Sequence, residues 1–373
     1  VMSLHRVSDI YGPLPVLHFG ETENPYNSQE ECYMHFFETL DSAIAVLKDV
    51  VENNPDAKPL EEVDALYHGD YSKWLKLANS VKLRLAMRIC YVKPDLAKQY
   101  AMEAVRDGVM ETADDSALFQ SWGSITVINP LEKIWNGYSD TRMGASMDSY
   151  LNGYNDPRLP VYFQPVTDGD NKGEYRGVAN GMPNPQQEDY KAMSSPNVQE
   201  KSTDSPLRWM MASEVAFLRA EGAMRGWTAE MGGTAEEFYN KGIELSFLEN
   251  GLSADAAARY AADETSKPTD FTDVSAANTK YNISALGKIA IKWNSGASEE
   301  EQLERIITQK WIAMFPNGTE AWSEFRRTGY PRLFPVRYNY PSSGVDTNKQ
   351  IRRMVFPQSE YSNNGAAVQE AVK

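Results

Sequence analysis

The sequence is poor in the residues and motifs that mark several common protein classes. It has only two cysteines, Cys32 and Cys90, too few for a disulfide framework or a zinc motif. No run approaches the roughly 18 to 20 consecutive apolar residues of a membrane span. Residues Val1 to Tyr11 lack the basic start and apolar core of a signal peptide, and Val1 is no natural start, so we expect a mature or shortened chain.

Basic residues are scarce relative to acids, with 37 Lys and Arg against 52 Asp and Glu. The resulting net charge of −15 argues against a nucleic-acid partner, because phosphate contacts need a basic surface. Residues 326–353 depart from this balance, with seven basic residues against a single acid, Asp346. These side chains either pair with the acidic remainder of the fold, which is the commoner arrangement, or form a patch for an anionic ligand.

Catalytic and metal-binding motifs are missing as well. The chain has no G-x-G-x-x-G, G-x-S-x-G or H-E-x-x-H, and its four histidines lack paired spacing for a metal. The stretch from Asp168 to Glu174 fails as a calcium loop, because Lys172 stands where a ligand belongs. We therefore expect no metal and no cofactor. Glu214 and Glu221 share a helix face, as a catalytic pair of carboxylates could. However, Glu221 also precedes an arginine by four residues, which is typical of helix-surface pairing.

What the sequence does contain is helical periodicity. Asp70 and Ser298 occupy N-cap positions, and Pro94 opens the helix that follows it. Paired helices of about 34 to 40 residues suggest tetratricopeptide-like hairpins, although no clean consensus repeats. Apolar residues recur at steps of three and four in six segments, which predicts helices at about 28–53, 70–93, 95–109, 211–226, 234–250 and 298–315.

Two regions lack this periodicity. Residues 114–207 are rich in Gly, Pro, Asn, Asp and aromatics, which predicts a large loop-rich excursion with short helices at most. Residues 329–373 contain four spaced prolines, among them Pro357, which predicts an irregular C-terminal layer without long helices.

The expected architecture is mainly α. We expect one domain over residues 1–373, in which a tetratricopeptide-like helical scaffold at about 28–110 and 208–328 carries the aromatic-rich excursion and the irregular tail.

Six segments have an individual character, namely DIYGPLPV (9–16), ANSVKLRLAMRI (78–89), NDPRLPVYFQPV (155–166), MMASEVAFLRAEGAMRGW (210–227), ITQKWIAMFPNGTEAWSEFRRTGYPRL (307–333) and RRMVFPQSEYSNN (352–364). Together they resemble the SusD/RagB family of nutrient-binding outer-membrane lipoproteins, and they occur in the family's order. The DIYG-type segment begins at Asp9, so we expect the leading part of the family, with its lipid anchor, to be absent from this chain.

The resemblance implies a tetratricopeptide-based fold, similar to SusD, and a lipid-anchored position on the cell surface of a Bacteroidetes-type bacterium. It also implies a SusC-like, TonB-dependent transporter as partner. Such proteins hold an oligosaccharide over the mouth of the transporter and do not cleave it.

Candidate ligand residues are aromatics of the excursion, because sugars stack their C–H faces on flat rings beside polar groups. Trp74, Trp227, Trp311 and Trp322 accompany helical patterns and are expected in the core, whereas Trp293 is a weaker extra candidate. The predicted ligand-binding set comprises Trp122, Trp135, Tyr138, Tyr154, Tyr175 and Tyr190, with Asn129, Asp140 and Arg142 as the nearest polar groups.

Non-catalytic glycan capture for import is the main functional prediction. The alternatives are binding of peptides or another nutrient by the same fold, and a general tetratricopeptide interaction scaffold, which would need a longer run of regular repeats. A glycosidase is a further alternative that release of reducing ends would reveal, because two of the 52 acids can meet from distant positions.

Overall fold

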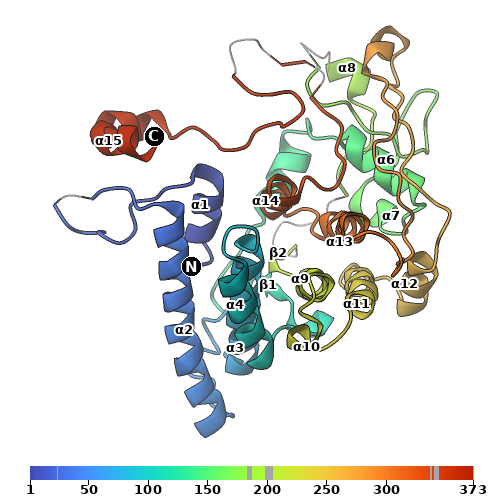
Figure 1. Cartoon of the computed structure of the whole chain (residues 1–373). Coiled ribbons are helices and arrows are strands. Elements are labelled where there is room, and N and C mark those ends of the chain that lie inside the picture. The colour runs from blue at the N-terminus through green and yellow to red at the C-terminus, as the bar shows by residue number, and fades with distance from the viewer. Residues whose placement is uncertain (23, 183–186, 198–204, 337, 340–343, 373) are drawn as a thin grey trace.

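The computed structural model describes residues 1–22, 24–182, 187–197, 205–336, 338–339 and 344–372, and Figure 1 shows its course. The fold is mainly α, as predicted. The longer helices are α1 (Leu4–Tyr11), α2 (Gln29–Asn53), α3 (Tyr71–Arg88), α4 (Pro94–Arg106), α6 (Ala145–Gly153), α9 (Ala212–Met224), α11 (Ala235–Leu248), α12 (Ala254–Ala261), α13 (Glu299–Ala313), α14 (Gly318–Thr328) and α15 (Gln358–Ala371).

The helix starts follow from the capping residues. The Asp70 side chain accepts hydrogen bonds from the backbone at the start of α3, and Ser298 accepts from the Glu301 N–H of α13. Pro94 occupies the first turn of α4, where its missing N–H costs nothing. These three predictions are confirmed. A short helix, α10 (Thr228–Met231), lies between α9 and α11, where only a turn was expected.

Helix α9 lies between the α3–α4 hairpin and the α11–α13 helices (Figure 1). It contributes residues to two apolar cores. Val215 and Leu218 face the first core, which is built mainly by α2, α3 and α4. Phe217 and Ala220 face the second core, which is rich in aromatic residues from α6, α11, α12 and α13. Because it is buried on both sides, α9 has the character of an interior helix.

The loop-rich excursion is closed at its base by a small sheet. Strand β1 (Ala117–Phe119) pairs antiparallel with β2 (Leu207–Met210), with Phe119 opposite Leu207. The rings of Phe119 and Trp209 stack at 5.0 Å between centroids. The two ends of the excursion therefore meet next to α9, and its aromatic residues are held against the helical scaffold.

A buried ion network joins α1, α3, α9, α13 and α14. Arg84 binds both carboxylate oxygens of Glu214 at 2.7 Å, and Arg327 binds both oxygens of Glu221 at 2.6 Å. Glu221 also accepts from Arg225, but it is buried, so its predicted role on the helix surface is wrong. The network contains five acids and five bases, namely Asp9, Glu214, Glu221, Glu320, Glu324, Arg84, Arg88, Arg225, Lys310 and Arg327.

Part of the basic segment 326–353 pairs with acids, which is the first of the two predicted arrangements. Arg327 joins the buried network, and Arg332 pairs with Glu304 at 3.5 Å. Arg326 and Arg352 instead bond to each other's backbone carbonyl oxygens. Arg337 lies outside the described residues.

The prediction of an irregular tail is wrong beyond Pro357. This proline stands at the N-cap of α15, a position before the first helical turn where proline does not break a helix. The tail leaves the body as a long connection and places α15 above α1 (Figure 1). Tyr26 donates to Glu360 of α15 at 2.5 Å.

Within the described part of the chain, no helix has the length and apolar character needed to cross a bilayer.

Candidate functional site

A concave surface lined by aromatic residues surrounds Trp135, in the excursion. Trp135 lies in a single π-helical turn, η2 (Lys133–Gly137), a local irregularity that often accompanies functional sites. Two cavities, of about 260 and 450 Å³, flank this residue, and both are also lined by Phe315 at the end of α13. We call this surface the Trp135 cleft.

Phe315 is the centre of an aromatic group in the cleft. Its ring is nearly parallel to that of Trp135, with 6.0 Å between centroids and 10° between planes. Tyr162 and Phe163, from the family-like segment of the excursion, lie 4.9 and 5.1 Å from Phe315. Trp135 itself is half-buried, so its ring is fixed on one side and remains accessible on the other.

The two polar residues predicted near Trp135 support the cleft. Asn129 caps the turn before η2 by accepting from the Leu131 N–H, and it donates to the Pro206 carbonyl at 3.2 Å. Its amide thus ties the Trp135 turn to the other end of the excursion. Arg142 lines the smaller cavity, where its guanidinium donates to the Lys191 carbonyl at 2.7 Å. Burial lowers the pKa of Arg142.

The larger cavity also contains an engaged carboxylate. Glu249 accepts from the Ser116 hydroxyl and from both the backbone and the hydroxyl of Ser213. Burial raises the pKa of Glu249, and these hydrogen bonds act in the opposite direction. Arg208 lies beside it, bonded to Asn250 at 3.1 Å, while its buried Nη1 has no hydrogen-bond partner among the described residues.

Four of the predicted residues lie outside this aromatic group. Trp122 stacks on His68, with 3.5 Å between ring centroids, and its indole donates to the Glu61 carbonyl. Tyr138 is 60% exposed and lies under Lys133, whereas Tyr175 packs against the second core. Asp140 is exposed and raises the pKa of its neighbour Arg142.

Tyr154 and Tyr190 were predicted to bind the ligand, but the structure places both inside the protein. Tyr154 ends α6 and is 1% exposed, and its hydroxyl donates to the Ile289 carbonyl. Tyr190 is 6% exposed and is bonded to Asp273 and Asn278. Both were expected on loops, but both rings pack inside the protein and offer no face to a ligand.

Several tryptophans also differ from the prediction. Trp227 is buried, as expected, whereas Trp311 is only partly buried and lines the smaller cavity of the cleft. Trp322 is partly exposed and carries Arg326 over its ring. Trp293, the weaker ligand candidate, is instead buried in the second core. Trp311 and Phe315 are thus two aromatic residues of the cleft that the sequence did not predict.

One group has the spacing of metal ligands, in the part of the chain that is described. Ligand atoms of His5, Asp9 and Glu320 lie within 4.8 Å of one another. However, Arg88 bonds to Glu320 at 2.5 Å and lies 3.5 Å from Asp9. A cation at this position would have to displace that guanidinium, so the group fits the ion network better than it fits a metal.

The comparisons place this geometry in a family. The SusD-like model, described as "Susd and RagB outer membrane lipoprotein", matches residues 1–373. A chitin-binding SusD homologue from Flavobacterium johnsoniae is 40% identical with a TM-score of 0.92, over 99% of this chain and 75% of that one. A SusD-like protein from Bacteroides thetaiotaomicron is 41% identical with a TM-score of 0.90, again over 99% of this chain and 75% of that one.

A SusD homologue from Bacteroides vulgatus is 34% identical with a TM-score of 0.92, over 100% of this chain and 74% of its own. Among curated proteins, none matches the chain. The match of the family model over the full sequence, together with these structures, shows that the chain belongs to the SusD/RagB family of outer-membrane lipoproteins.

Proposed function

We propose that this protein captures oligosaccharides in the Trp135 cleft and releases them uncleaved for import. The observation that carries the proposal is that Trp135 and Phe315 together line two adjoining cavities. A chain of sugar rings needs such adjacent subsites, since each ring stacks on an aromatic face and bonds to polar groups at its edge.

Polar groups for the sugar hydroxyls lie along both cavities. Asn180 and Gln350 line the smaller one, and Arg208, Asn197 and Asn317 line the larger one. The Nη1 atom of Arg208, which has no hydrogen-bond partner among the described residues, is a donor that a sugar oxygen can satisfy. Two cations, Arg142 and Arg208, and two acids, Glu132 and Glu249, also line the cavities, so the described lining carries no net charge, which supports an uncharged glycan as the ligand.

The non-catalytic part of the proposal rests on how Glu249 is held. Both of its carboxylate oxygens accept hydrogen bonds from Ser116 or Ser213. A glycosidase needs one free acid and one free base across the scissile bond. A carboxylate bonded in this way serves the structure of the cavity wall, so Glu132 is the one remaining acid among the described lining residues of the two cavities.

A panel of soluble polysaccharides, run with soluble chitin oligosaccharides as competitors, tests this function. Chitin is the first probe because one similar structure is a chitin-binding SusD homologue. We expect at least one polysaccharide to retard the protein in affinity electrophoresis, with no release of reducing ends. Retardation should be lost in Trp135→Ala and kept in Trp122→Ala, a matched tryptophan of the same excursion. Release of reducing ends would contradict the proposal.

We further propose that the lipid-anchored form acts at the outer membrane with a SusC-like, TonB-dependent transporter. The family's description as outer-membrane lipoproteins supports this location. Cross-linking in outer membranes followed by affinity purification should recover a TonB-dependent barrel with this protein. Recovery of the protein alone after efficient cross-linking would contradict the partnership.

A further inference from the structure

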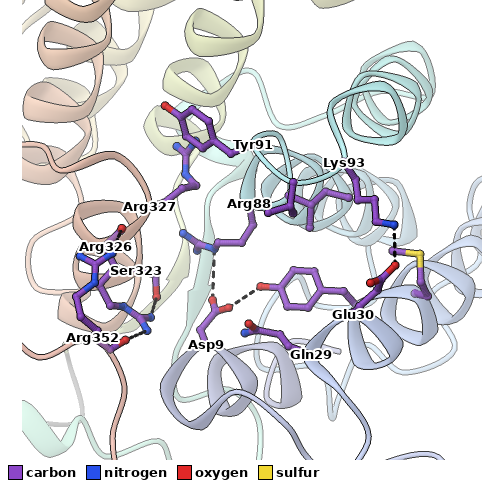
Figure 2. A pocket seen from close by; sticks show the side chains of 14 residues that line it. Asp9, Gln29, Glu30, Arg88, Tyr91, Lys93, Ser323, Arg326, Arg327 and Arg352 are labelled. Carbon is purple, nitrogen blue, oxygen red and sulfur yellow. Dashed lines mark hydrogen bonds and ion pairs between the residues drawn. The ribbon is translucent and has the colours of Figure 1, made fainter. Parts of the chain in front are cut away.

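Another cavity, of about 680 Å³, lies apart from the Trp135 cleft and differs from it in chemistry. Its walls come from α1, α2, the α3–α4 connection, α14 and the tail, and we call it the basic cavity. In Figure 2, Arg326 and Arg352 lie together on one wall, and Lys93 with Glu30 lies on the opposite one. Its volume is in the range of ordinary ligand sites.

Most charges that line the basic cavity are already paired. Arg88 and Arg327 belong to the buried network, and Lys93 bonds to Glu30 at 2.8 Å. Asp9 accepts a 2.5 Å hydrogen bond from Tyr33 and lies 3.5 Å from Arg88. These groups therefore form a floor that is close to neutral, and they leave the positive charge of the cavity to other residues.

Arg326 and Arg352 carry that remaining charge. In the described ranges, neither forms an ion pair; each donates to the other's backbone carbonyl, and Arg326 also donates to Ser323. The Arg326 Nε atom is buried without a hydrogen-bond partner in the same part of the chain. Burial lowers the pKa of Arg326, and nearby Arg88 and Arg352 lower it further, whereas Asp9 raises it. In a protein of net charge −15, two adjacent arginines without a carboxylate are a place for an anion.

We propose that the basic cavity binds an acidic peptide segment of a partner protein, with Arg326 and Arg352 holding a carboxylate side chain. The planar guanidinium fork matches a carboxylate in geometry and charge. The aliphatic side chains of Met34, Ile89 and Val92 line the same cavity and suit an apolar side chain beside the acidic one. Val92 is 74% exposed and would be covered by such a segment.

An acidic sugar fits the basic cavity less well, because the cavity has no free aromatic platform among its lining residues. The Tyr33 ring is 3% exposed and its hydroxyl is bonded to Asp9. Tyr91 is exposed, but guanidinium groups lie over its ring, that of Arg225 at 4.5 Å and that of Arg327 at 5.9 Å. A sugar would have to displace these cations to stack, whereas a peptide needs only the carboxylate and aliphatic contacts.

The proposal does not depend on glycan binding, since the basic cavity and the Trp135 cleft share no lining residue. The probes are two capped, fluorescently labelled peptides of Glu, Leu and Gly, identical except that one has Gln in place of every Glu. We expect the Glu peptide to bind at least tenfold more tightly, as measured by fluorescence anisotropy at low salt. Raising the salt concentration should weaken it, as for any ligand held by exposed charges.

Two variants locate the peptide. Arg326→Gln combined with Arg352→Gln should weaken binding of the Glu peptide at least tenfold, whereas Arg353→Gln, a neighbouring exposed arginine outside the cavity lining, should change it less than twofold. An unchanged melting temperature and unchanged glycan retardation would show that the double variant is folded.

Three results would overturn the proposal. One is equal binding of the Glu and Gln peptides, and another is the absence of binding to the unaltered protein. The third is tighter binding of oligogalacturonate than of the Glu peptide with the same dependence on Arg326 and Arg352, which would identify an acidic glycan as the ligand.

Discussion

The Trp135 cleft and the basic cavity lie at opposite ends of α14. Asn317, the N-cap of this helix, lines the cleft, whereas Ser323, Arg326 and Arg327 line the basic cavity. An eleven-residue helix is about 16 Å long, so the two regions are neighbours along one element. One region presents aromatic rings and amides, and the other presents guanidinium groups with aliphatic walls.

This difference follows from how each region is supported. The cleft rests on the aromatic second core, so that a ring such as Trp135 extends from a packed group of rings. The basic cavity rests on the buried ion network, and its free arginines lie at the edge of a set of paired charges. The supporting layer thus determines which chemistry reaches the surface: apolar stacking in one region, charge recognition in the other.

The largest expected effect comes from breaking the network below the basic cavity. Glu214→Gln would remove the carboxylate that Arg84 hydrogen-bonds and leave only Glu320 at 3.9 Å, which costs about 3–5 kcal/mol of the free energy of unfolding. Urea denaturation measures this. The control is Glu230→Gln, which loses a solvent-accessible pair with Lys98 and should change the free energy of unfolding far less. Equal effects of the two changes would show that the network contributes nothing beyond surface pairing.

A smaller effect is expected when the free energy of unfolding is measured as a function of pH, because His5 lies beside the buried network. Burial and then Arg84 lower the pKa of His5 from 6.5 to about 3. Between these values the unfolded chain binds a proton that the folded protein rejects, so stability falls as pH falls. The free energy of unfolding should therefore fall by about 2 kcal/mol between pH 7 and pH 5. In His5→Gln, stability should change less over that interval. An unchanged pH slope would contradict a neutral, buried His5.

Below pH 4.5, the carboxylates of the network add to this loss. Arg88 and Arg84 offset the cost of burying Glu320 and lower its pKa to about 2, so its contribution is present above pH 4.5 and is lost as pH falls toward 2. The loss of stability due to His5 falls between pH 7 and pH 5 and can therefore be measured apart from the loss due to the carboxylates, which falls below pH 4.5. In Glu320→Gln, acid titration should show a smaller loss of stability below pH 4.5 and an unchanged loss between pH 7 and pH 5.

The smallest effect tests the buried tyrosines near the cleft. Tyr154→Phe removes a 3.2 Å hydrogen bond to Ile289 inside the second core, which costs about 0.5–1.5 kcal/mol of stability. Glycan affinity should not change, because the ring is not accessible. A large loss of affinity with unchanged stability would restore Tyr154 to the ligand site.

The helical scaffold could be predicted because its signals are local. Asp70, Pro94 and Ser298 mark helix starts through their own side chains, and the apolar spacing between them is regular. Helix α15 was missed because Pro357 was interpreted as a helix breaker although it precedes the first turn. The β1–β2 sheet was missed because its strands are three and four residues long and lie far apart in the sequence.

The site was harder to predict, because exposure depends on tertiary packing. Trp135, Asn129 and Arg142 were predicted together and do line the two cavities of the cleft. Tyr154 and Tyr190 have the same loop-like sequence surroundings, yet both are buried. Phe315 and Trp311 have the spacing of core residues. A useful signal for Phe315 was the Pro316–Gly318 break that follows it, which places an aromatic ring at a helix end, beside the excursion.

The most direct test of glycan capture at the cleft is the dissociation constant of the polysaccharide that retards the protein, measured by calorimetry with two changes at Trp135. Trp135→Phe keeps a flat ring and should weaken binding only a few-fold. Trp135→Ala removes the ring and should weaken it at least tenfold, or by about 1.4 kcal/mol. Dissociation constants for both variants within twofold of that of the unaltered protein would contradict capture in the Trp135 cleft.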